Sequence, residues 1–351
     1  MAAINIYIDS ATGSNVNAGD GKTEVESTNG NWSTTTNVFT AASGTPFSGV
    51  SVGDLGALRN DGAGTAAWIG RVTSIGGGGS SLTFASTGAG SKPTTSATGR
   101  TCKVGGKLEG PATGSGFPFN LSNYYLLRSA AGERTITWWK NSSTLSITDT
   151  LAFNTLARVI GYSSTPGDGG YVTITSSSTT GTCTTGADTI LENFKLTNTG
   201  GSGTPYCIQS TGVLRNCVAY GTRGVGFDMS TSGTLIECEA YNCNTSNTAG
   251  YGGAKLNSSV IAINCFFHDN TGSNNVGVIC AGSQQQSVIN CVFDSNQIGL
   301  RATDGRPLSI LNCDFYNNAS HGIYMADGDS GTAMYLIKNC NFLKNRRMSG
   351  G

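Results

Sequence analysis

The chain has 351 residues and a mass of 36.0 kDa, enough for one elongated domain or two ordinary ones. Its 21 Lys and Arg balance its 21 Asp and Glu, so no global field attracts nucleic acid or an anionic membrane. Charged residues make up only 12% of the chain and Gly accounts for 51 residues, a composition typical of a turn-rich β protein. No apolar run reaches the roughly 20 residues of a transmembrane helix, and no basic and apolar signal region opens the chain. We therefore expect neither membrane insertion nor a signal peptide.

The first 110 residues are expected to form a cap and a small β insertion. Residues 1–40 open with a predicted strand at Ile4–Ile8, and we expect this segment to cover strand edges that would otherwise pair with other chains. Residues 41–110 are predicted to form a β insertion that serves as an attachment module. The glycine run 76–79 leads into the strand-like stretch 81–84, which indicates a hairpin. No Gly-Lys-Ser or Gly-Lys-Thr follows the run, which excludes a phosphate loop of that type.

Residues 111–186 read as irregular early turns of a longer β structure. The stretch 135–140 is strand-like and contains Trp138 and Trp139, which point to opposite faces of a regular strand. One of them is therefore expected in the core and the other at the surface. A surface Trp there can stack on a sugar ring, pack within the chain, or contact another subunit.

The stretch 187–345 repeats one short phrase, seen as Val-Ile-Asn-Cys-Val-Phe at 288–293 and Ile-Leu-Asn-Cys-Asp-Phe at 310–315. Each copy has an anchor residue, and the anchors lie 21 to 27 residues apart: Asn193, Asn216, Glu237, Asn264, Asn290, Asn312 and Asn339. The residues one and three after the anchor are apolar or Cys and alternate with polar or mixed ones, which is the period of a β-strand. A repeat of about 25 residues is too short for a strand and a crossover helix. Each repeat is therefore one turn of a coil, with its strands roughly 4.8 Å above those of the turn below.

Stacking of like positions in successive turns predicts ladders of like side chains. We expect a Cys ladder, a Phe ladder, and Asn ladders at the anchor and at Asn270, Asn296, Asn318 and Asn345. Stacked buried Asn amides can hydrogen-bond along the coil axis, which explains Asn where the chain bends. The prediction is an all-β fold in which residues 111–351 form a single-stranded parallel β-helix, a solenoid with regular turns over 187–345.

The eleven cysteines do not suggest a disulfide scaffold. Six of them follow the anchor directly: Cys217, Cys238, Cys265, Cys291, Cys313 and Cys340. Parallel side chains on successive turns point the same way, and not at each other, so we expect reduced thiols that pack as small apolar groups. The other five cannot be paired from the sequence: Cys102, Cys183, Cys207, Cys243 and Cys280. With two histidines and no Cys-x-x-Cys motif, no metal site and no cofactor is expected.

The phrase Ile-x-Asn-Cys-x-Phe-x-x-Asn at 310–318, followed by Gly-Ile-Tyr at 322–324, resembles the right-handed parallel β-helix repeats of the pectin-lyase-like superfamily. That superfamily includes pectate lyases, polygalacturonases, and many bacteriophage tailspike and capsid-surface proteins, and the chain most resembles the bacteriophage members. The resemblance implies a right-handed coil. It implies little about chemistry, because one scaffold hosts many functions.

The register places acids and a histidine on the outer face of two adjacent turns. Four residues after the anchor the column reads Tyr220, Tyr241, His268, Asp294, Tyr316 and Leu343, and Asp269 lies one residue beyond His268. Paired carboxylates beside aromatic rings suit glycoside hydrolysis, which needs one acid and one base or nucleophile. His268, Asp269 and Asp294 are therefore the catalytic candidates. Tyr241, His268, Asp294 and Tyr316 are the candidate contacts to a glycan or a protein partner, and a plain solvated face is the alternative.

Motifs that the resemblance implies for its enzymes are largely missing. Polygalacturonases carry Asp-Asp and Gly-His-Gly elements, whereas this chain has no Asp-Asp, and its Ser-His-Gly at 320–322 matches only half of the second element. Pectate lyases use acids for calcium and an Arg base, for which Arg301 near Asp304 is the candidate, with a surface ion pair as the alternative. The turn 326–331 has two acids but lacks the later Glu of a calcium loop.

Three functions remain. The first is a non-catalytic structural protein on the surface of a bacteriophage virion, a capsid decoration or a spike or fibre subunit, with glycan binding as a further expectation. It predicts a homo-oligomer (a trimer) made in the host cytoplasm and bound to other virion proteins, capsid or tail, and to cell-surface polysaccharide. No recognisable cap follows Asn345, which also favours assembly. The second is a polysaccharide lyase or glycoside hydrolase, as in depolymerising tailspikes. The third is a bacterial adhesin, which normally needs an export signal.

Overall fold

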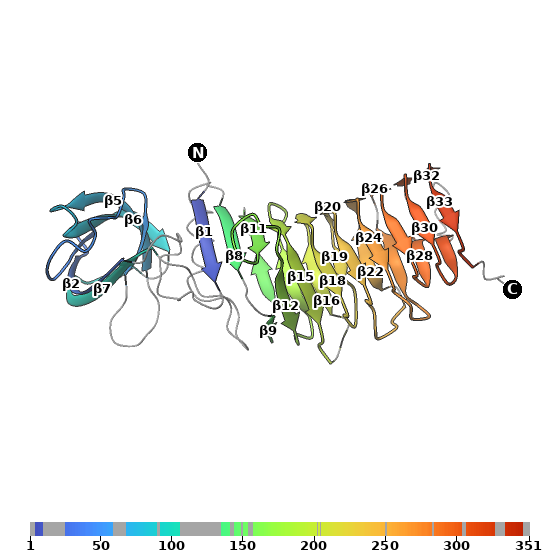
Figure 1. Cartoon of the computed structure of the whole chain (residues 1–351), viewed down its shortest axis with the longest axis horizontal. Coiled ribbons are helices and arrows are strands. Elements are labelled where there is room, and N and C mark those ends of the chain that lie inside the picture. The colour runs from blue at the N-terminus through green and yellow to red at the C-terminus, as the bar shows by residue number, and fades with distance from the viewer. Residues whose placement is uncertain are drawn as a thin grey trace. The chain divides into compact units, whose positions relative to one another are not determined.

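The computed structural model describes residues 4–9, 25–58, 68–89, 92–105, 135–140, 144–148, 150–153, 157–201, 203, 205–249, 251–282, 284–303, 307–326 and 334–346. The chain divides into two compact units, Met1–Ala112 with Phe117–Ser142, and Thr113–Gly116 with Ser143–Gly351. The described residues form β-strands, drawn as arrows in Figure 1, and no helix among them is long and apolar enough to cross a membrane.

The first unit contains a closed antiparallel barrel in the order β2-β3-β6-β5-β4-β7. Its strands are β2 (Val25–Ser33), β3 (Val38–Thr40), β4 (Leu55–Leu58), β5 (Trp68–Gly76), β6 (Ser81–Ala89) and β7 (Ala97–Val104). The small β insertion predicted at 41–110 is thus a barrel, but its strands already begin at Val25, within the segment 1–40 that was expected to form the cap. The glycine run 76–79 forms the turn of the β5–β6 hairpin.

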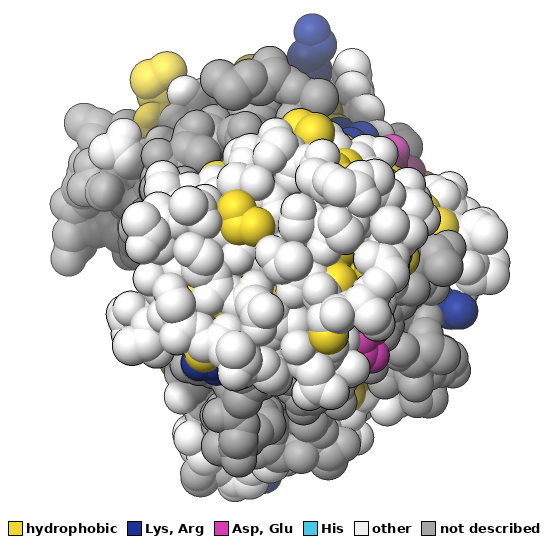
Figure 2. All heavy atoms as spheres, turned by 90° about the vertical axis from the view of Figure 1, so that its left-hand side faces the viewer, with side chains coloured by type: hydrophobic (Ala, Val, Ile, Leu, Met, Phe, Trp, Pro, Cys, Tyr) yellow, Lys and Arg dark blue, Asp and Glu magenta, His cyan; other side chains and the backbone are white. Residues whose placement is uncertain are grey.

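An aromatic cluster fills the barrel. The ring centroids of Trp32 and Trp68 lie 5.8 Å apart, and those of Trp68 and Phe84 lie 5.7 Å apart. All three rings are buried, and each contributes about 1.5–3 kcal/mol through burial. On the face that Figure 2 shows, charged side chains are few and hydrophobic ones lie scattered. The barrel therefore buries its apolar residues internally.

Two further strands belong to the first unit. β1 (Ile4–Asp9), the predicted first strand, pairs in parallel with β8 (Thr135–Lys140). In β8 the two tryptophans point to opposite faces as predicted, because Trp139 is fully buried whereas Trp138 is half-buried.

In the second unit the described strands form three parallel sheets that run along a coil (Figure 1). Sheet 1 contains β11 (Ala157–Tyr162), β14 (Ile190–Glu192), β17 (Val213–Arg215), β20 (Ser232–Ile236), β23 (Ser259–Ile263), β26 (Gln286–Ile289), β29 (Leu308–Leu311) and β32 (Tyr335–Lys338). Sheet 2 contains β9 (Leu145–Ile147), β12 (Val172–Ser176), β15 (Phe194–Asn198), β18 (Val218–Tyr220), β21 (Glu239–Tyr241), β24 (Phe266–His268), β27 (Val292–Asp294), β30 (Asp314–Tyr316) and β33 (Asn341–Leu343). Sheet 3 contains β10 (Leu151–Phe153), β13 (Gly181–Thr185), β16 (Tyr206–Ser210), β19 (Phe227–Met229), β22 (Gly252–Asn257), β25 (Val276–Ala281), β28 (Ile298–Ala302) and β31 (His321–Met325).

Successive rungs, each meaning one turn of the coil, contribute strands to sheets 1, 2 and 3 in turn, and the predicted register holds along the axis. Phe267, Phe293, Phe315 and Phe342 are Cα partners on successive strands of sheet 2. Their rings stack at centroid distances of 5.5, 4.6 and 5.0 Å. The all-β parallel solenoid inferred from the repeats is therefore confirmed.

The anchor residues form the corner between sheets 1 and 2, where they adopt the left-handed backbone conformation. Their φ values lie between 46° and 62° at Asn193, Asn216, Glu237, Asn264, Asn290, Asn312 and Asn339. Asn adopts this conformation more readily than other non-glycine residues. The prediction of buried amides is wrong for most anchors, because those from Glu237 onwards are exposed, although the side chains of Asn216 and Asn193 do bond at 2.8 Å. Backbone geometry at the corner, more than amide burial, accounts for the anchor.

Replacing an exposed anchor should therefore test backbone strain alone. We expect Asn264→Val to destabilise the chain by about 1–2 kcal/mol, because a β-branched residue is strained at a φ of 54°. Asn264→Gly should stay within about 1 kcal/mol of the native chain, because Gly adopts positive φ without strain. Thermal unfolding followed by circular dichroism measures both; equal losses in the two variants would contradict the left-handed corner.

The second Asn ladder is buried at Asn270, Asn296 and Asn318, as predicted, and half-buried at Asn345. Asn270 Nδ2 donates to Asn296 Oδ1 at 2.8 Å, Asn296 to Asn318 at 3.2 Å, and Asn318 to Asn345 at 2.8 Å. Each of the last three amides also donates to a main-chain carbonyl of sheet 2, as Asn296 does to Phe267 at 2.9 Å. Along this column, amides saturate backbone groups at the bend after sheet 2.

All eleven cysteines are free thiols, in accord with the prediction. In five of the six ladder cysteines Sγ lies near a carbonyl of an adjacent rung, as Cys217 Sγ lies 3.5 Å from Leu191 O and Cys313 Sγ 3.5 Å from Val288 O. Burial raises the pKa of Cys207 to about 12, so its thiol stays neutral at physiological pH. Neutral buried thiols are inert packing groups.

A polar turn follows β11, where a single carboxylate organises the loop. Asp168 accepts backbone hydrogen bonds from Ser163, Ser164, Thr165 and Gly170 at 2.7–3.3 Å, and these hold its pKa far below the ordinary value. This carboxylate thus fixes the conformation of the turn at 163–170.

The depressed pKa of Asp168 gives a pH prediction. Its contribution to stability is fully present above the unfolded pKa of about 3.9 and is lost as the pH falls toward the folded value. We expect the amides of Ser163–Thr165 to keep their chemical shifts and exchange protection from pH 7 down to about pH 4, and Asp168→Asn to remove both throughout this range. Amide NMR measures this; loss of protection already near pH 5 in the native chain would contradict it.

Candidate functional site

The outer face of sheet 2 carries two rows of side chains that the register sets side by side. One row reads Lys195, Val218, Glu239, Phe266, Val292, Asp314 and Asn341, and the other Tyr220, Tyr241, His268, Asp294, Tyr316 and Leu343. These positions alternate with the buried Phe ladder, which holds the strands in place. The candidate residues therefore lie on a rigid surface.

Aromatic rings stack along the second row. Tyr220 and Tyr241 have centroids 5.6 Å apart, Tyr241 and His268 lie 5.1 Å apart, and both pairs are within 20° of parallel. Lys195 Nζ lies 4.9 Å from the ring centroid of Tyr220. Since the rings face each other, they contact a ligand mainly through their edges and hydroxyl groups.

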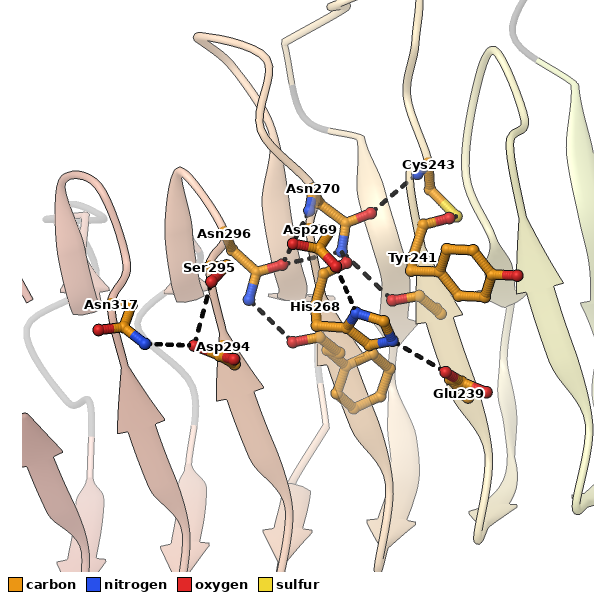
Figure 3. Close-up of polar contacts among 12 residues, drawn as sticks. Glu239, Tyr241, Cys243, His268, Asp269, Asn270, Asp294, Ser295, Asn296 and Asn317 are labelled. Carbon is orange, nitrogen blue, oxygen red and sulfur yellow. Dashed lines mark hydrogen bonds and ion pairs between the residues drawn. The ribbon is translucent and has the colours of Figure 1, made fainter.

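His268 binds a carboxylate at each ring nitrogen. Nδ1 lies 2.8 Å from Asp269 Oδ2 and Nε2 lies 2.9 Å from Glu239 Oε1, as Figure 3 shows. Both contacts are donor–acceptor pairs when the ring carries both protons. The His268 side chain is 15% exposed and also stacks on Phe266 at 4.0 Å. The imidazole is thus held in place by the carboxylates of Asp269 and Glu239 and by the ring of Phe266.

The two other predicted acids have different surroundings. Asp294 is the Cα partner of His268, yet its carboxylate binds Asn317 Nδ2 at 2.9 Å and Ser295 Oγ at 3.2 Å. Asp269 lies at the second corner with a φ of 54°, so its residue type also suits the backbone there. The structure therefore brings together His268 and Asp269, and it turns Asp294 toward the next rungs (Figure 3).

Tyr316, the last predicted contact, lies one rung beyond Asp294. Its pKa is raised, first by partial desolvation and then by the adjacent carboxylate of Asp314. Asp314 itself accepts a hydrogen bond from Asn341 Nδ2 at 2.7 Å. The phenol therefore remains protonated at neutral pH and can serve as a hydrogen-bond donor.

Glu239 was not among the predicted site residues. It lies two positions after its anchor, and the same register that selected His268 places it beside that histidine on the adjacent rung. A column read two residues after each anchor would have found it. The cluster around His268 therefore includes a second carboxylate, Glu239, that was not among the candidates chosen from the sequence.

The remaining motifs contribute little to this site. Arg301 lies on the outer face of sheet 3, with its guanidinium 5.7 Å from the ring centroid of Tyr324, while Asp304 lies outside the described residues, as does most of the turn 326–331. His321 Nδ1 lies 2.6 Å from Ser320 Oγ. Within the described part of the chain, no group of three or more His, Cys, Asp or Glu could hold a metal ion.

Comparison with known proteins gives the class of fold. Residues 206–350 match the family described as the right-handed beta helix region. No curated protein matches the chain. The second unit is therefore a right-handed parallel β-helix, the fold that the repeats predict.

Solved structures similar to the chain are distant. ORF18 of Geobacillus virus E2 is 13% identical with a TM-score of 0.41, and the match covers 63% of this chain and 55% of that one, little more than half its length. The A-module of mannuronan C-5 epimerase AlgE4 from Azotobacter vinelandii is 10% identical with a TM-score of 0.35, covering 65% and 92%. Tailspike protein gp49 of Pseudomonas phage LKA1 is 10% identical with a TM-score of 0.21, covering 92% and 65%. These likenesses concern the fold alone.

Proposed function

We propose that the protein is a non-catalytic structural protein on the surface of a bacteriophage particle, with the outer face of sheet 2 as its contact to a polysaccharide. The bacteriophage assignment rests on the resemblance of the repeats. The observation that carries the non-catalytic part is the set of contacts at His268, whose two ring nitrogens are both engaged by carboxylates. An acid or base must reach the proton it transfers, and the two carboxylate partners of His268 disfavour its imidazole in that role.

Asp294 supports the same view. Its carboxylate is bound by Asn317 and Ser295, both on the same outer face or its corner. These contacts do not arrange His268 and Asp294 on the two sides of one glycosidic bond, as catalysis by this pair would require. Instead, the rows offer hydroxyl, amide and carboxylate groups in a line, which suits hydrogen bonding to an extended hydroxyl-rich polymer.

The thiols support assembly in a reducing compartment. All eleven cysteines are free, including the six that lie on adjacent rungs. Disulfides persist in oxidising compartments, whereas thiols are kept reduced in the cytosol, where phage particles assemble. This favours the virion protein over an exported adhesin.

A cleavage and binding assay tests the proposal. The purified chain is incubated with alginate, homogalacturonate and dextran, and cleavage is measured as new reducing ends and unsaturated ends. Binding is measured as retardation of the protein in affinity electrophoresis with each polymer. We expect no chain shortening with the native chain or with Asp294→Ala, and retardation of migration by at least one polymer that Tyr241→Ala weakens. Shortening by the native chain that Asp294→Ala abolishes would overturn the non-catalytic assignment, and absence of retardation would overturn the contact face.

A polysaccharide lyase or glycoside hydrolase is the second candidate, because Glu239, His268 and Asp269 form one acid–base cluster on the outer face. In that case His268→Gln should abolish cleavage while the unfolding temperature stays within a few degrees of the native value. Only this alternative gives shortened polymer in the same assay.

A further inference from the structure

The outer face of sheet 1 has a composition opposite to that of sheet 2. Along one outward row, Cα partners on successive strands are Glu192, Arg215, Ile236, Ile263, Ile289, Leu311 and Lys338. Along the other they are Ile190, Val213, Thr234, Ile261, Ser287, Ser309 and Leu336. Four consecutive rungs between Arg215 and Lys338 thus present no charged side chain on this face. We call the outward apolar residues of these rungs, together with Leu336 on the next rung, the aliphatic stripe: Ile236, Ile261, Ile263, Ile289, Leu311 and Leu336.

The stripe is accessible to solvent. Ile261 is 40% exposed and Leu336 is 52% exposed, and Ile236, Ile263, Ile289 and Leu311 are half-buried. A solvated strand face normally carries polar residues at alternate positions. Neighbouring apolar side chains that are exposed or half-buried in this way are typical of interaction surfaces.

Strand propensity alone does not explain the stripe. Isoleucine is favoured in all strands, and the same preference acts on the other two sheets. The outward row of sheet 3 nevertheless reads Gln209, Asp228, Lys255, Ile279, Arg301 and Tyr324, and that of sheet 2 contains Glu239, Asp294 and Asp314. Aliphatic residues are therefore concentrated on one of three faces.

We propose that the aliphatic stripe is the surface on which a second copy of this chain packs, with its coil axis aligned in the same direction. The strands that carry the stripe follow one another along the coil in the order β20, β23, β26, β29 and β32 (Figure 1), with a rung spacing of roughly 4.8 Å. A partner with the same spacing can place its aliphatic side chains between those of the first copy over the whole length.

Charge supports a second copy as the occupant. The chain carries 21 cationic and 21 anionic residues, so two copies do not repel each other overall. At one end of the stripe Glu192 lies one rung from the exposed Arg215 and binds Arg158 at 2.7 Å. An aligned copy brings its own Glu192 within one rung of Arg215, which allows ion pairs in both directions at the polar rim. In a trimer each stripe meets the stripes of two neighbours.

Sedimentation velocity on the full chain tests the assignment. We expect the native chain to sediment as a multiple of 36.0 kDa and the double variant Ile263→Glu with Ile289→Glu to raise the dissociation constant at least ~100-fold, because charges enter an apolar interface. The matched control Val292→Glu places the same side chain on the outer face of sheet 2 and should leave the assembly intact. A native chain that is monomeric at all concentrations, or a double variant that stays assembled, would overturn the proposal.

Cross-linking keeps the test valid if the double variant misfolds. The native cysteines are free and ten of the eleven are buried, so a cysteine introduced on the surface supplies the reactive thiol. Leu336→Cys, at one end of the stripe, should form a disulfide between copies, because aligned copies bring the two positions together. Tyr324→Cys, 38% exposed on sheet 3, should not. Cross-linking of both, or of Tyr324→Cys alone, would contradict the aligned packing on the stripe, as would no cross-linking at Leu336→Cys.

Discussion

Phe293→Asp is expected to unfold the coil. The ring is fully buried and stacks on Phe267 at 5.5 Å and on Phe315 at 4.6 Å, with the second pair parallel within 4°. The variant loses the burial of an aromatic ring, the stacking energy and the packing of both neighbours, and it places a carboxylate where nothing pairs with it. We expect a loss of at least about 4 kcal/mol, a large part of the stability of an ordinary domain. Thermal unfolding by circular dichroism measures it.

Asp294→Ala is the matched control, because it changes the next residue of the same strand. That side chain faces outward and bonds Asn317 and Ser295 at the surface. We expect a loss of no more than about 1 kcal/mol. If Phe293→Asp melts like the native chain, or if the two variants lose equal stability, the alternation of inward and outward residues in sheet 2 is wrong.

Asn296→Leu should have the second largest effect. The amide is 1% exposed; its Oδ1 accepts from Asn270 Nδ2 at 2.8 Å, and its Nδ2 donates to Asn318 Oδ1 at 3.2 Å and to Phe267 O at 2.9 Å. Leucine has the same number of side-chain heavy atoms and the same branching but leaves these buried groups unsatisfied, each at a cost of about 1–3 kcal/mol. We expect a total loss of about 3–5 kcal/mol in chemical denaturation.

Gln297→Ala provides the comparison for the ladder. This half-buried residue follows Asn296, and the backbone bond from its N–H to Asn270 O is kept in the variant. We expect a change within about 0.5 kcal/mol. If Asn296→Leu is as stable as Gln297→Ala, the Asn column fills space and does not hold the rungs together through its amides.

The regular rungs could be predicted because their determinants are local and repeated. An apolar residue at one place in each repeat, Phe in the last four, fixes the register, since a slip of one residue would turn Phe293 outward and Asp294 inward. The barrel was harder, because its strands have no repeat: the sequence suggested an insertion over 41–110, whereas the barrel strands begin at Val25. Antiparallel pairing between strands as distant as β2 and β7 leaves no periodic trace in the sequence.

The anchor positions were predicted correctly as bends, but the reason given for Asn there, amide burial, was incomplete. Asn264 is exposed with a φ of 54°, whereas Asn296 is buried in an amide ladder. Both are Asn in a column, and the sequence does not distinguish a backbone requirement from a hydrogen-bonding one. Glu237 at an anchor position was the available indication, because a side chain so different from Asn implies a position that accepts any exposed residue able to adopt this φ.

The candidate site was predicted in part. The register correctly placed His268 and Asp294 on adjacent strands of one face. It did not predict that His268 would bind Glu239 and Asp269 while Asp294 bonds away from it, because side-chain rotamers decide those contacts. The aliphatic face of sheet 1 could also have been read from the same columns, since Ile236, Ile263 and Ile289 each directly precede an anchor.

The most direct test of the proposed virion-surface role is immunogold electron microscopy of phage particles released from cells that carry the gene for the chain, with antibodies against the purified protein. The predicted result is gold labelling of intact particles at the capsid surface or on tail spikes or fibres. Labelling confined to the medium or the cell envelope, with none on particles, would contradict the account and favour a free enzyme or an adhesin.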